Sequence, residues 1–177
     1  MSEVLRWKQP RRMNREFVLL RGSEAVASLN FHSLLSNRAT GTYGNKMLEL
    51  STEGIFNWRI RVTTKVLGGQ AALLRVSQGL HQGADFELLD GRMLRIASKG
   101  VFRRSWTLSD KTAGQARNLL ALIETRQFFE DASDVVIEDV RSSDPDPLFL
   151  AIVTWYFVLI MHQHESAAAS GAASAST

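Results

Sequence analysis

The feature that most constrains the fold is a run of fourteen residues, LFLAIVTWYFVLIM from Leu148 to Met161. Only Thr154 in this run is neither apolar nor aromatic. A helix that is apolar on every face has to be enclosed, either by protein or by lipid. At about 1.5 Å per residue the run is roughly 21 Å long, whereas a bilayer core needs about 30 Å and about twenty apolar residues. We therefore expect protein to enclose this helix, with the rest of the chain as its wrapping.

Composition indicates one soluble domain. The chain has 177 residues, of which 45% are hydrophobic and 22% are charged. It contains no cysteine, which excludes disulfides and thiolate-rich metal sites. The first residues lack the apolar stretch of a signal peptide, so we expect a cytoplasmic location. We predict a folded domain over residues 1–165, and a disordered, low-complexity Ala/Ser-rich tail over 166–177.

The N-terminal third of the chain is typical of short strands joined by tight turns. Val4 to Gln9 alternates as a strand does, and a basic, proline-containing link follows it. The segments 16–22 and 25–31 flank Ser23-Glu24, which predicts a hairpin. A second hairpin is predicted around Gly44-Asn45, because glycine and asparagine readily supply the positive φ values of a tight turn.

The clearest single strand is GIFNWRIRV, residues 54–62, which places an apolar set on one face and Arg59 and Arg61 on the other. After the Gly68-Gly69 turn, AALLRVS places Arg75 on the face opposite Ala72 and Leu74. If these two strands are antiparallel neighbours, their three arginines share the outer surface. The candidate site for an anionic headgroup is therefore Arg59, Arg61 and Arg75.

Further strands with regular turns follow up to residue 110, which is typical of a sandwich or barrel. Arg104 has the strand parity of buried neighbours, which a bulge or an inward ion pair would explain. Residues 112–131 fit either a helix or a buried strand, and we predict a strand because they continue a β meander. Residues 134–140 are predicted as a strand. Asp146 and Pro147 then mark the start of a helix over 147–164.

Together these patterns predict a mainly β fold with one added helix. We expect a single closed or nearly closed antiparallel β-barrel of about ten to twelve strands around the hydrophobic C-terminal helix. The opening LRWKQP, the hairpins that carry Trp58 and Trp106, and the closing PDPLFLAIVTWYFVLIM resemble the tubby C-terminal-like superfamily. That superfamily includes the LURP-one-related and scramblase-like proteins, and the chain looks most like its small bacterial members. The resemblance covers roughly residues 4–164.

The resemblance implies a barrel of about twelve strands around a hydrophobic helix, and a ligand that is an anionic phospholipid. Tubby proteins bind phosphoinositide headgroups through paired basic side chains, but their site does not align with this chain residue by residue. Arg59, Arg61 and Arg75 therefore rest on strand alternation alone. The chain offers no motif for a cofactor, and none is expected.

Charge is distributed unevenly along the chain despite a net charge of only +3. Residues 92–117 hold seven basic side chains against one acid, whereas residues 124–146 hold eight acids against two arginines. Such asymmetry attracts a phosphate-bearing partner, although two solvated faces of a folded domain give the same pattern. Nucleic acid is not expected as a partner, because no recognition helix or aromatic-basic platform is present.

Motifs for catalysis are missing: there is no GxSxG, GxxxxGK[ST], GxGxxG or HExxH. A metal site would need a third ligand beside His162 and His164, while His32 and His81 stand alone. The acid pairs Asp144/Asp146 and Glu138/Asp139 are better explained by loop solvation and helix capping than by acid/base chemistry. We therefore predict that the protein is not an enzyme and holds no metal.

Two classes of function remain, with one weaker alternative. The first is a non-catalytic binding module at the membrane surface, with anionic phospholipid as its partner. The second is a protein-interaction or structural domain, whose partner and oligomeric state the sequence leaves open. The weaker alternative is a C-terminal tail anchor, but residues 147–162 are too few for a span and no basic cluster immediately precedes them.

Overall fold

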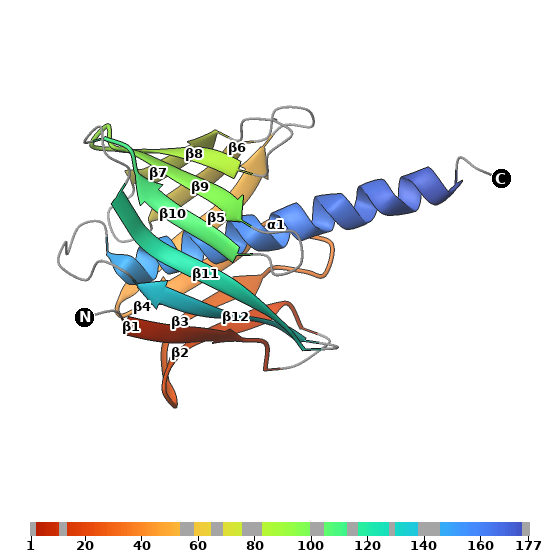
Figure 1. Cartoon of the computed structure of the whole chain (residues 1–177), viewed down its shortest axis with the longest axis horizontal. Helices are drawn as coiled ribbons and strands as arrows, with labels where there is room; N and C mark the ends of the chain where they lie inside the picture. Colours follow the sequence, from red (N-terminus) through yellow and green to blue (C-terminus); the bar gives the residue numbers. More distant parts are fainter. Residues whose placement is uncertain are drawn as a thin grey trace.

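A computed structural model describes residues 3–10, 14–53, 59–64, 69–75, 83–99, 105–112, 117–127, 130–137 and 146–174. For residues 69–75, 99, 125–127, 130–132 and 167–174 it describes the backbone alone. Within these ranges, twelve strands precede one helix (Figure 1). Their bounds are β1 Glu3–Lys8, β2 Glu16–Arg21, β3 Glu24–Phe31, β4 Ala39–Tyr43, β5 Lys46–Glu53, β6 Arg59–Thr64, β7 Gly69–Arg75, β8 Gly83–Leu88, β9 Met93–Lys99, β10 Ser105–Asp110, β11 Arg117–Gln127, β12 Glu130–Ile137 and α1 Pro147–Ser174.

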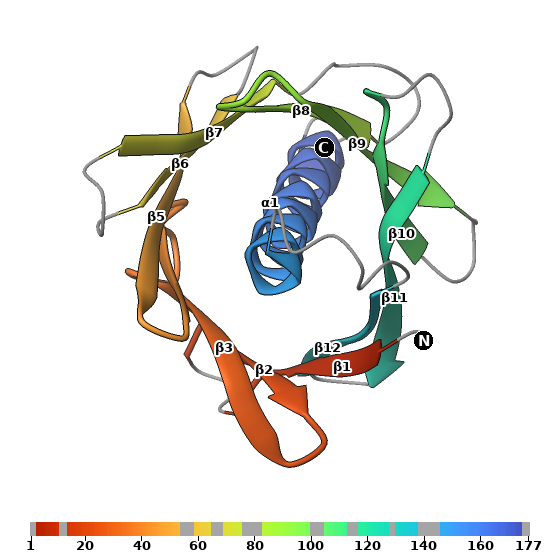
Figure 2. The ribbon, with the colours of Figure 1, turned by 90° about the vertical axis from the view of Figure 1, so that its left-hand side faces the viewer.

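The strands form one antiparallel sheet in which each strand pairs with its neighbours in the chain. β1 joins the two ends of this order, because Trp7 lies opposite Leu19 of β2 on one side and opposite Ser133 of β12 on the other. The described strands thus make a closed ring, and Figure 2 shows α1 inside it. The expected mainly β fold, with one antiparallel sheet and a C-terminal helix, is confirmed.

Two glycines lie in the turns of the N-terminal hairpins. The turn predicted at Gly44-Asn45 is confirmed, whereas the turn predicted at Ser23-Glu24 lies one residue earlier and begins at Gly22. Gly22 has φ 61° between β2 and β3, and Gly44 has φ 54° between β4 and β5. An L side chain is strained at such angles, whereas glycine adopts them without a steric cost. Both predicted hairpins are therefore confirmed, and Tyr43 lies opposite Lys46 across the second turn.

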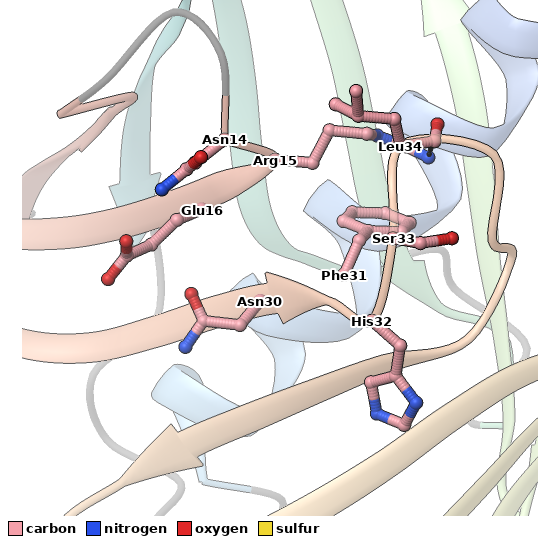
Figure 3. A pocket seen from close by; sticks show the side chains of 8 residues that line it. All are labelled: Asn14, Arg15, Glu16, Asn30, Phe31, His32, Ser33 and Leu34. Atoms are coloured by element: carbon pink, nitrogen blue, oxygen red, sulfur yellow. Dashed lines mark hydrogen bonds between the residues drawn. The ribbon is translucent and has the colours of Figure 1, made fainter.

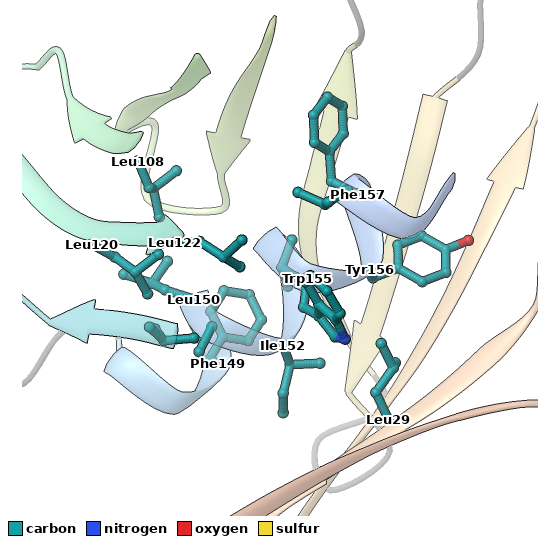
Figure 4. Close-up of a cluster of buried hydrophobic side chains, with 14 of the residues drawn as sticks. Leu29, Leu108, Leu120, Leu122, Phe149, Leu150, Ile152, Trp155, Tyr156 and Phe157 are labelled. Atoms are coloured by element: carbon teal, nitrogen blue, oxygen red, sulfur yellow. The ribbon is translucent and has the colours of Figure 1, made fainter. Parts of the chain in front are cut away.

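The core consists of α1 and the inward side chains of the strands. Residues 149–160 of the helix are all buried, so every face of the helix is covered. Trp155 stacks on Trp7 of β1 at a centroid distance of 6.2 Å and meets Phe17 of β2 edge-on at 5.8 Å. Figure 4 shows Phe157, Tyr156 and Trp155 leaving the helix in different directions toward the strands. The predicted enclosure of this helix by protein is confirmed.

The ambiguous segment 112–131 is β-structure wherever it is described from Arg117 onward. β11 runs from Arg117 to Gln127, with Leu120 and Leu122 buried in the barrel. The predicted boundary with the next strand was placed too late, because β12 begins at Glu130 rather than at Asp134. Gln127 pairs with Glu130 at the end of a long hairpin. The residues at this end are polar and show no apolar alternation, so the sequence pattern does not mark them as strand.

The helix is longer than predicted, and the prediction of disorder from residue 166 is wrong as far as residue 174. Its predicted range ends at residue 164, whereas α1 continues to Ser174. The added segment, ESAAASGAAS, is rich in alanine, the strongest helix former. An alanine-rich segment that follows an enclosed helix needs no new nucleation step, so propagation carries the helix beyond the barrel (Figure 1).

Candidate functional site

The sequence-predicted arginines lie on β6 and β7, and the structure places two of their side chains. Arg59 and Arg61 are exposed on β6, while Ile60 and Val62 between and beside them are buried. Arg75 lies directly opposite Arg59 in the register of β6 and β7, but its side chain is outside the described part. β6 and β7 are antiparallel neighbours, which is the condition under which the three arginines were expected to share one surface.

Acidic residues interrupt this arginine face. Arg61 donates a hydrogen bond to the Glu53 carboxylate at 3.0 Å. On β8, Asp85 lies 3.5 Å from the Arg95 guanidinium and 3.7 Å from the Lys111 amine. The cross-strand register also forms a row over β5 to β9 in which acids and bases are mixed: Glu53, Arg59, Arg75, Asp85 and Arg95. The outer face of these strands is therefore a mixed-charge surface rather than a uniformly basic one.

The two ends of the barrel differ in what they hold. Because all neighbouring strands are antiparallel, the odd-numbered strands end at one rim and the even-numbered strands end at the other. α1 follows β12, so it begins near the rim where even-numbered strands end, which we name the start rim. It leaves the barrel at the other one, the exit rim (Figure 1).

Cations without a partner gather at the exit rim. Among the residues whose side chains are described, exposed Lys8, Arg38 and Arg59 make no side-chain hydrogen bond or ion pair. Lys8 ends β1, Arg38 immediately precedes β4 and Arg59 begins β6, so all three belong to the same rim. The acids Glu16, which begins β2, and Glu53, which ends β5, also lie at this rim, and Glu53 is engaged by Arg61.

Cations at or near the start rim are paired instead. Lys46 lies 4.0 Å from Asp146, Arg92 lies 2.6 Å from Asp90, and Arg21 contacts Glu3. Hydrogen bonding to Arg92 holds the pKa of the Asp90 carboxyl below its ordinary value. The described part of the chain therefore leaves its available positive charge at the end where the helix emerges.

Between Lys8 and Arg59 on this rim lies the loop that joins β3 to β4, residues 32–38, which we name the β3–β4 loop. Leu34 and Leu35 at its tip are 61% and 94% exposed. The Arg15 guanidinium supports the loop from below, since it donates hydrogen bonds to the carbonyls of Leu34 and Ser36 at 3.2 and 3.1 Å. It also lies 3.7 Å over the Phe31 ring.

An open pocket of about 390 Å³ lies beside this loop (Figure 3). Its walls come from the start of β2, the end of β3 and the loop itself, and Asn30 and Glu16 face each other across the two strands in the figure. The Asn30 side-chain oxygen is buried without a hydrogen-bond donor among the described residues. The pocket is open and polar, which suits a small polar group rather than an apolar ligand.

Tyr156 and Gln163 of α1 tie the loop to the emerging helix. The Tyr156 hydroxyl donates a hydrogen bond to the Asn37 carbonyl, and burial raises the pKa of that hydroxyl well above its ordinary value. With its amide oxygen facing Arg15, Gln163 accepts from that guanidinium at 2.7 Å and donates to the Asn37 side chain at 3.2 Å. These contacts hold the β3–β4 loop in one conformation against the helix.

A buried carboxylate lies near the exit on the opposite side of the helix. Glu124 of β11 has a side chain that is only 7% exposed, and it accepts a hydrogen bond from the Trp106 indole at 2.6 Å. His162 of α1 places Nε2 at 3.3 Å from the same carboxylate. Sequence reasoning missed this contact, because Glu124 follows five apolar residues, 119–123, and shows no motif. The Glu124 carboxylate links His162 of the helix to Trp106 of the barrel wall, so we interpret this contact as structural.

The described part of the chain assembles no candidate metal site. No group of three or more histidine or acidic side chains there is arranged to hold a metal ion. His32 shares a hydrogen bond with Thr40 at 3.1 Å, and burial lowers the pKa of His164. Asp146 caps α1, accepting from the Leu148 amide at 2.9 Å, as predicted. Asp144, Glu138, Asp139, His81 and Arg104 lie outside the described residues.

No family model matches this chain, and no curated protein or solved structure matches it either. The resemblance to the tubby C-terminal-like superfamily therefore stays a prediction, and the site has to be interpreted from its own geometry.

Proposed function

We propose that the protein is a non-catalytic binding module that docks its exit rim on an anionic phospholipid surface, in the cytoplasm and peripheral to the membrane. The observation that carries this proposal is the location of Lys8, Arg38 and Arg59, the exposed cations that lack partners in the described part of the chain. An unpaired arginine offers its full fork of donors to phosphate oxygens, whereas an arginine in an ion pair has to give up a partner first.

The filled interior supports an external site. Side chains of α1 and of the inward strand positions form one buried cluster in the barrel. A ligand would therefore bind at a rim or on the outer face. Each well-placed cation contributes about 1 kcal/mol to attraction by an anionic membrane, and salt screens this attraction over about 10 Å at 0.1 M. Three cations on one rim give weak, reversible and salt-sensitive binding.

The proposal retains the headgroup chemistry expected from the sequence but changes how much each of the three predicted arginines is expected to contribute to binding. Arg59 belongs to both the sequence-predicted set and the exit rim. Arg61 contributes less, because Glu53 already neutralises it. Arg75 stays a candidate on its register opposite Arg59. Membership of the tubby C-terminal-like superfamily fits the same picture, with twelve strands around an apolar C-terminal helix as its support.

A protein-interaction or structural role is the second candidate, and the mixed row of charges over β5 to β9 favours it. Opposite charges on neighbouring strands stabilise a sheet by cross-strand pairing and keep its surface soluble without any ligand.

The tail-anchor alternative rests on α1. Residues 147–166 of this helix are long and apolar enough to cross a membrane, although 67% of the apolar stretch is buried inside the protein. A helix enclosed by its own barrel cannot offer the same side chains to lipid.

The test compares charge reversal at the two rims. Replacing both Arg38 and Arg59 by Glu changes four units of charge at the exit rim, worth about 4 kcal/mol of membrane attraction. We expect this variant to lose low-salt binding to vesicles that contain phosphatidylserine or phosphoinositide. The thermal midpoint should stay nearly unchanged, because neither arginine is in an ion pair. Co-sedimentation with the vesicles measures the binding.

The matched control carries Arg21→Glu and Lys46→Glu, which change the net charge equally at the start rim. This variant should bind nearly as the wild type does. Arg61→Glu alone distinguishes binding at the exit rim from binding at the outer face of β6 and β7. It should weaken vesicle binding only if the outer strand face is the site, because only that site includes Arg61. If the wild-type protein ignores anionic vesicles at low salt, or if the exit-rim variant binds equally well, the protein-interaction role replaces the membrane role.

A further inference from the structure

We infer that the β3–β4 loop inserts Leu34 and Leu35 into the apolar layer of the membrane on which the exit rim docks. This inference rests on the proposed function and names the contact that would follow the electrostatic attraction. It assigns a role to two residues that the sequence patterns left unexplained, in the stretch HSLLSNR between β3 and β4.

Two features of these leucines are unusual: they are exposed at the tip of a loop, and they are adjacent in the chain. Leu35 is 94% exposed and Leu34 is 61% exposed, and the two are adjacent at the tip of a loop. The other large exposed hydrophobic side chains of the described residues lie apart from them: Val4, Met47, Leu89, Met93 and Ile123. Single exposed hydrophobic side chains are common on soluble proteins, whereas adjacent ones form a contiguous apolar patch, and such patches mark interaction surfaces.

The backbone of the loop is prepared for an apolar environment. A polar group that enters lipid has to carry its hydrogen-bond partner with it. Arg15 already satisfies the carbonyls of Leu34 and Ser36. The Ser36 amide donates to the Ser33 carbonyl at 3.2 Å, and the His32 amide donates to the Arg38 carbonyl at 3.0 Å. The loop can therefore approach the acyl boundary without stripping water from these groups.

The charges beside the loop indicate lipid rather than a protein groove as the occupant. The Arg38 side chain is exposed at the end of the loop and has no partner among the described residues, and Lys8 and Arg59 lie on the same rim. Cations that surround a protruding apolar tip complement a layer of anionic headgroups above an apolar interior. The contacts of Arg15 and Tyr156 hold the tip in place, so little ordering cost remains on binding.

A single labelled cysteine tests the inference, because the chain contains no cysteine of its own. Leu35→Cys carries an environment-sensitive fluorophore, and Leu89→Cys carries the same label as the matched control. Leu89 is 70% exposed and follows β8, which ends at the start rim. With phosphatidylcholine vesicles that contain phosphatidylserine, the label at residue 35 should shift to the blue and be quenched by brominated acyl chains. The label at residue 89 should do neither.

Binding of unlabelled variants gives a second measurement. Leu35→Ser should weaken binding to the same vesicles about tenfold, from the apolar surface it no longer buries. Leu89→Ser should bind as the wild type does. Both variants should keep the wild-type thermal midpoint, because both leucines are exposed in the folded protein.

The outcomes separate insertion from docking. If the wild-type protein binds anionic vesicles while the label at residue 35 stays in water and Leu35→Ser binds normally, insertion is wrong and headgroup docking stands. If nothing binds anionic vesicles, both are wrong. A blue shift that grows with protein concentration in the absence of vesicles would overturn the inference in favour of contact with a second copy of the chain.

Discussion

Gly41 shows at the level of one residue how closely the helix approaches the barrel wall. It lies on the inward face of β4, and a Cβ added there would lie 2.7 Å from Ile152 Cγ2 and 3.5 Å from Leu50 Cδ1. Ile152 is fully buried, so it has little room to move. Here glycine serves the close approach of two elements rather than a turn.

Gly41→Ala should therefore lower the free energy of unfolding by about 1–3 kcal/mol through overpacking. Chemical denaturation of the single variants and the double variant measures this. In an Ile152→Ala background the same change should cost less, because the clashing methyl group is gone. Equal costs in both backgrounds would mean that the contact with Ile152 is not the cause.

At the level of the element, α1 has a well-defined start and a fully buried apolar segment. The Asp146 cap and Pro147 set the first turn, and Phe157 deep in the barrel is fully buried, 5.6 Å from the Trp106 ring. The described residues near Phe157 form an apolar and aromatic cluster. The helix is therefore part of the folding core and not an appended segment.

Replacing Phe157 by Asp should prevent folding. An unpaired carboxylate in this position costs several kcal/mol, and the lost aromatic packing adds to it, against a total stability of about 5–15 kcal/mol for a domain. Circular dichroism and solubility after expression measure the effect. His164→Asp, at an exposed position of the same helix, is the control and should fold. A soluble Phe157→Asp protein that unfolds cooperatively would contradict the enclosed helix.

The whole molecule has one tyrosine near each rim of the barrel, and the chain contains only these two. Tyr43 ends β4 at the start rim, where burial and then the Asp146 charge raise its pKa to about 12. Tyr156 bonds to the β3–β4 loop at the exit rim, and its pKa is also raised by burial. Both phenols thus keep their protons in the folded barrel beyond the pH at which they lose them in the unfolded chain.

Stability should accordingly be retained below about pH 10, the ordinary pKa of tyrosine, and fall as the pH rises toward 12. In that range the unfolded chain has released protons that the folded chain still holds, so rising pH favours unfolding. Below pH 12, phenolate absorbance and circular dichroism should change together, because in that range the tyrosines lose their protons mainly in the unfolded chain. Between pH 10 and 12, Tyr43→Phe should lose a smaller part of its free energy of unfolding than the wild-type protein loses. Full phenolate formation near pH 10 in a still-folded barrel would contradict the burial of the two rings.

Much of the fold could be predicted from the sequence because its signals are local. Alternation along a strand, glycine at a turn and an all-apolar helix each follow from the geometry of a few consecutive residues. Arg59 and Arg61 were placed outward correctly for this reason, and Ile60 and Val62 inward. The end of α1 was not predicted, because a low-complexity tail was interpreted as disordered rather than as an alanine-rich continuation.

The candidate site depended on the tertiary structure, because partners far apart in the sequence decide which charges remain available. Arg61 is paired with Glu53 on the neighbouring strand. Lys8 and Arg38 stand out as available cations only in the folded barrel, where the end of β1 and the start of β4 lie at one rim and neither side chain has a partner among the described residues. The pair Leu34-Leu35 is visible in the sequence, but its exposure is not. Apolar residues are normally buried, and only the position of the loop outside a filled barrel keeps these two in solvent.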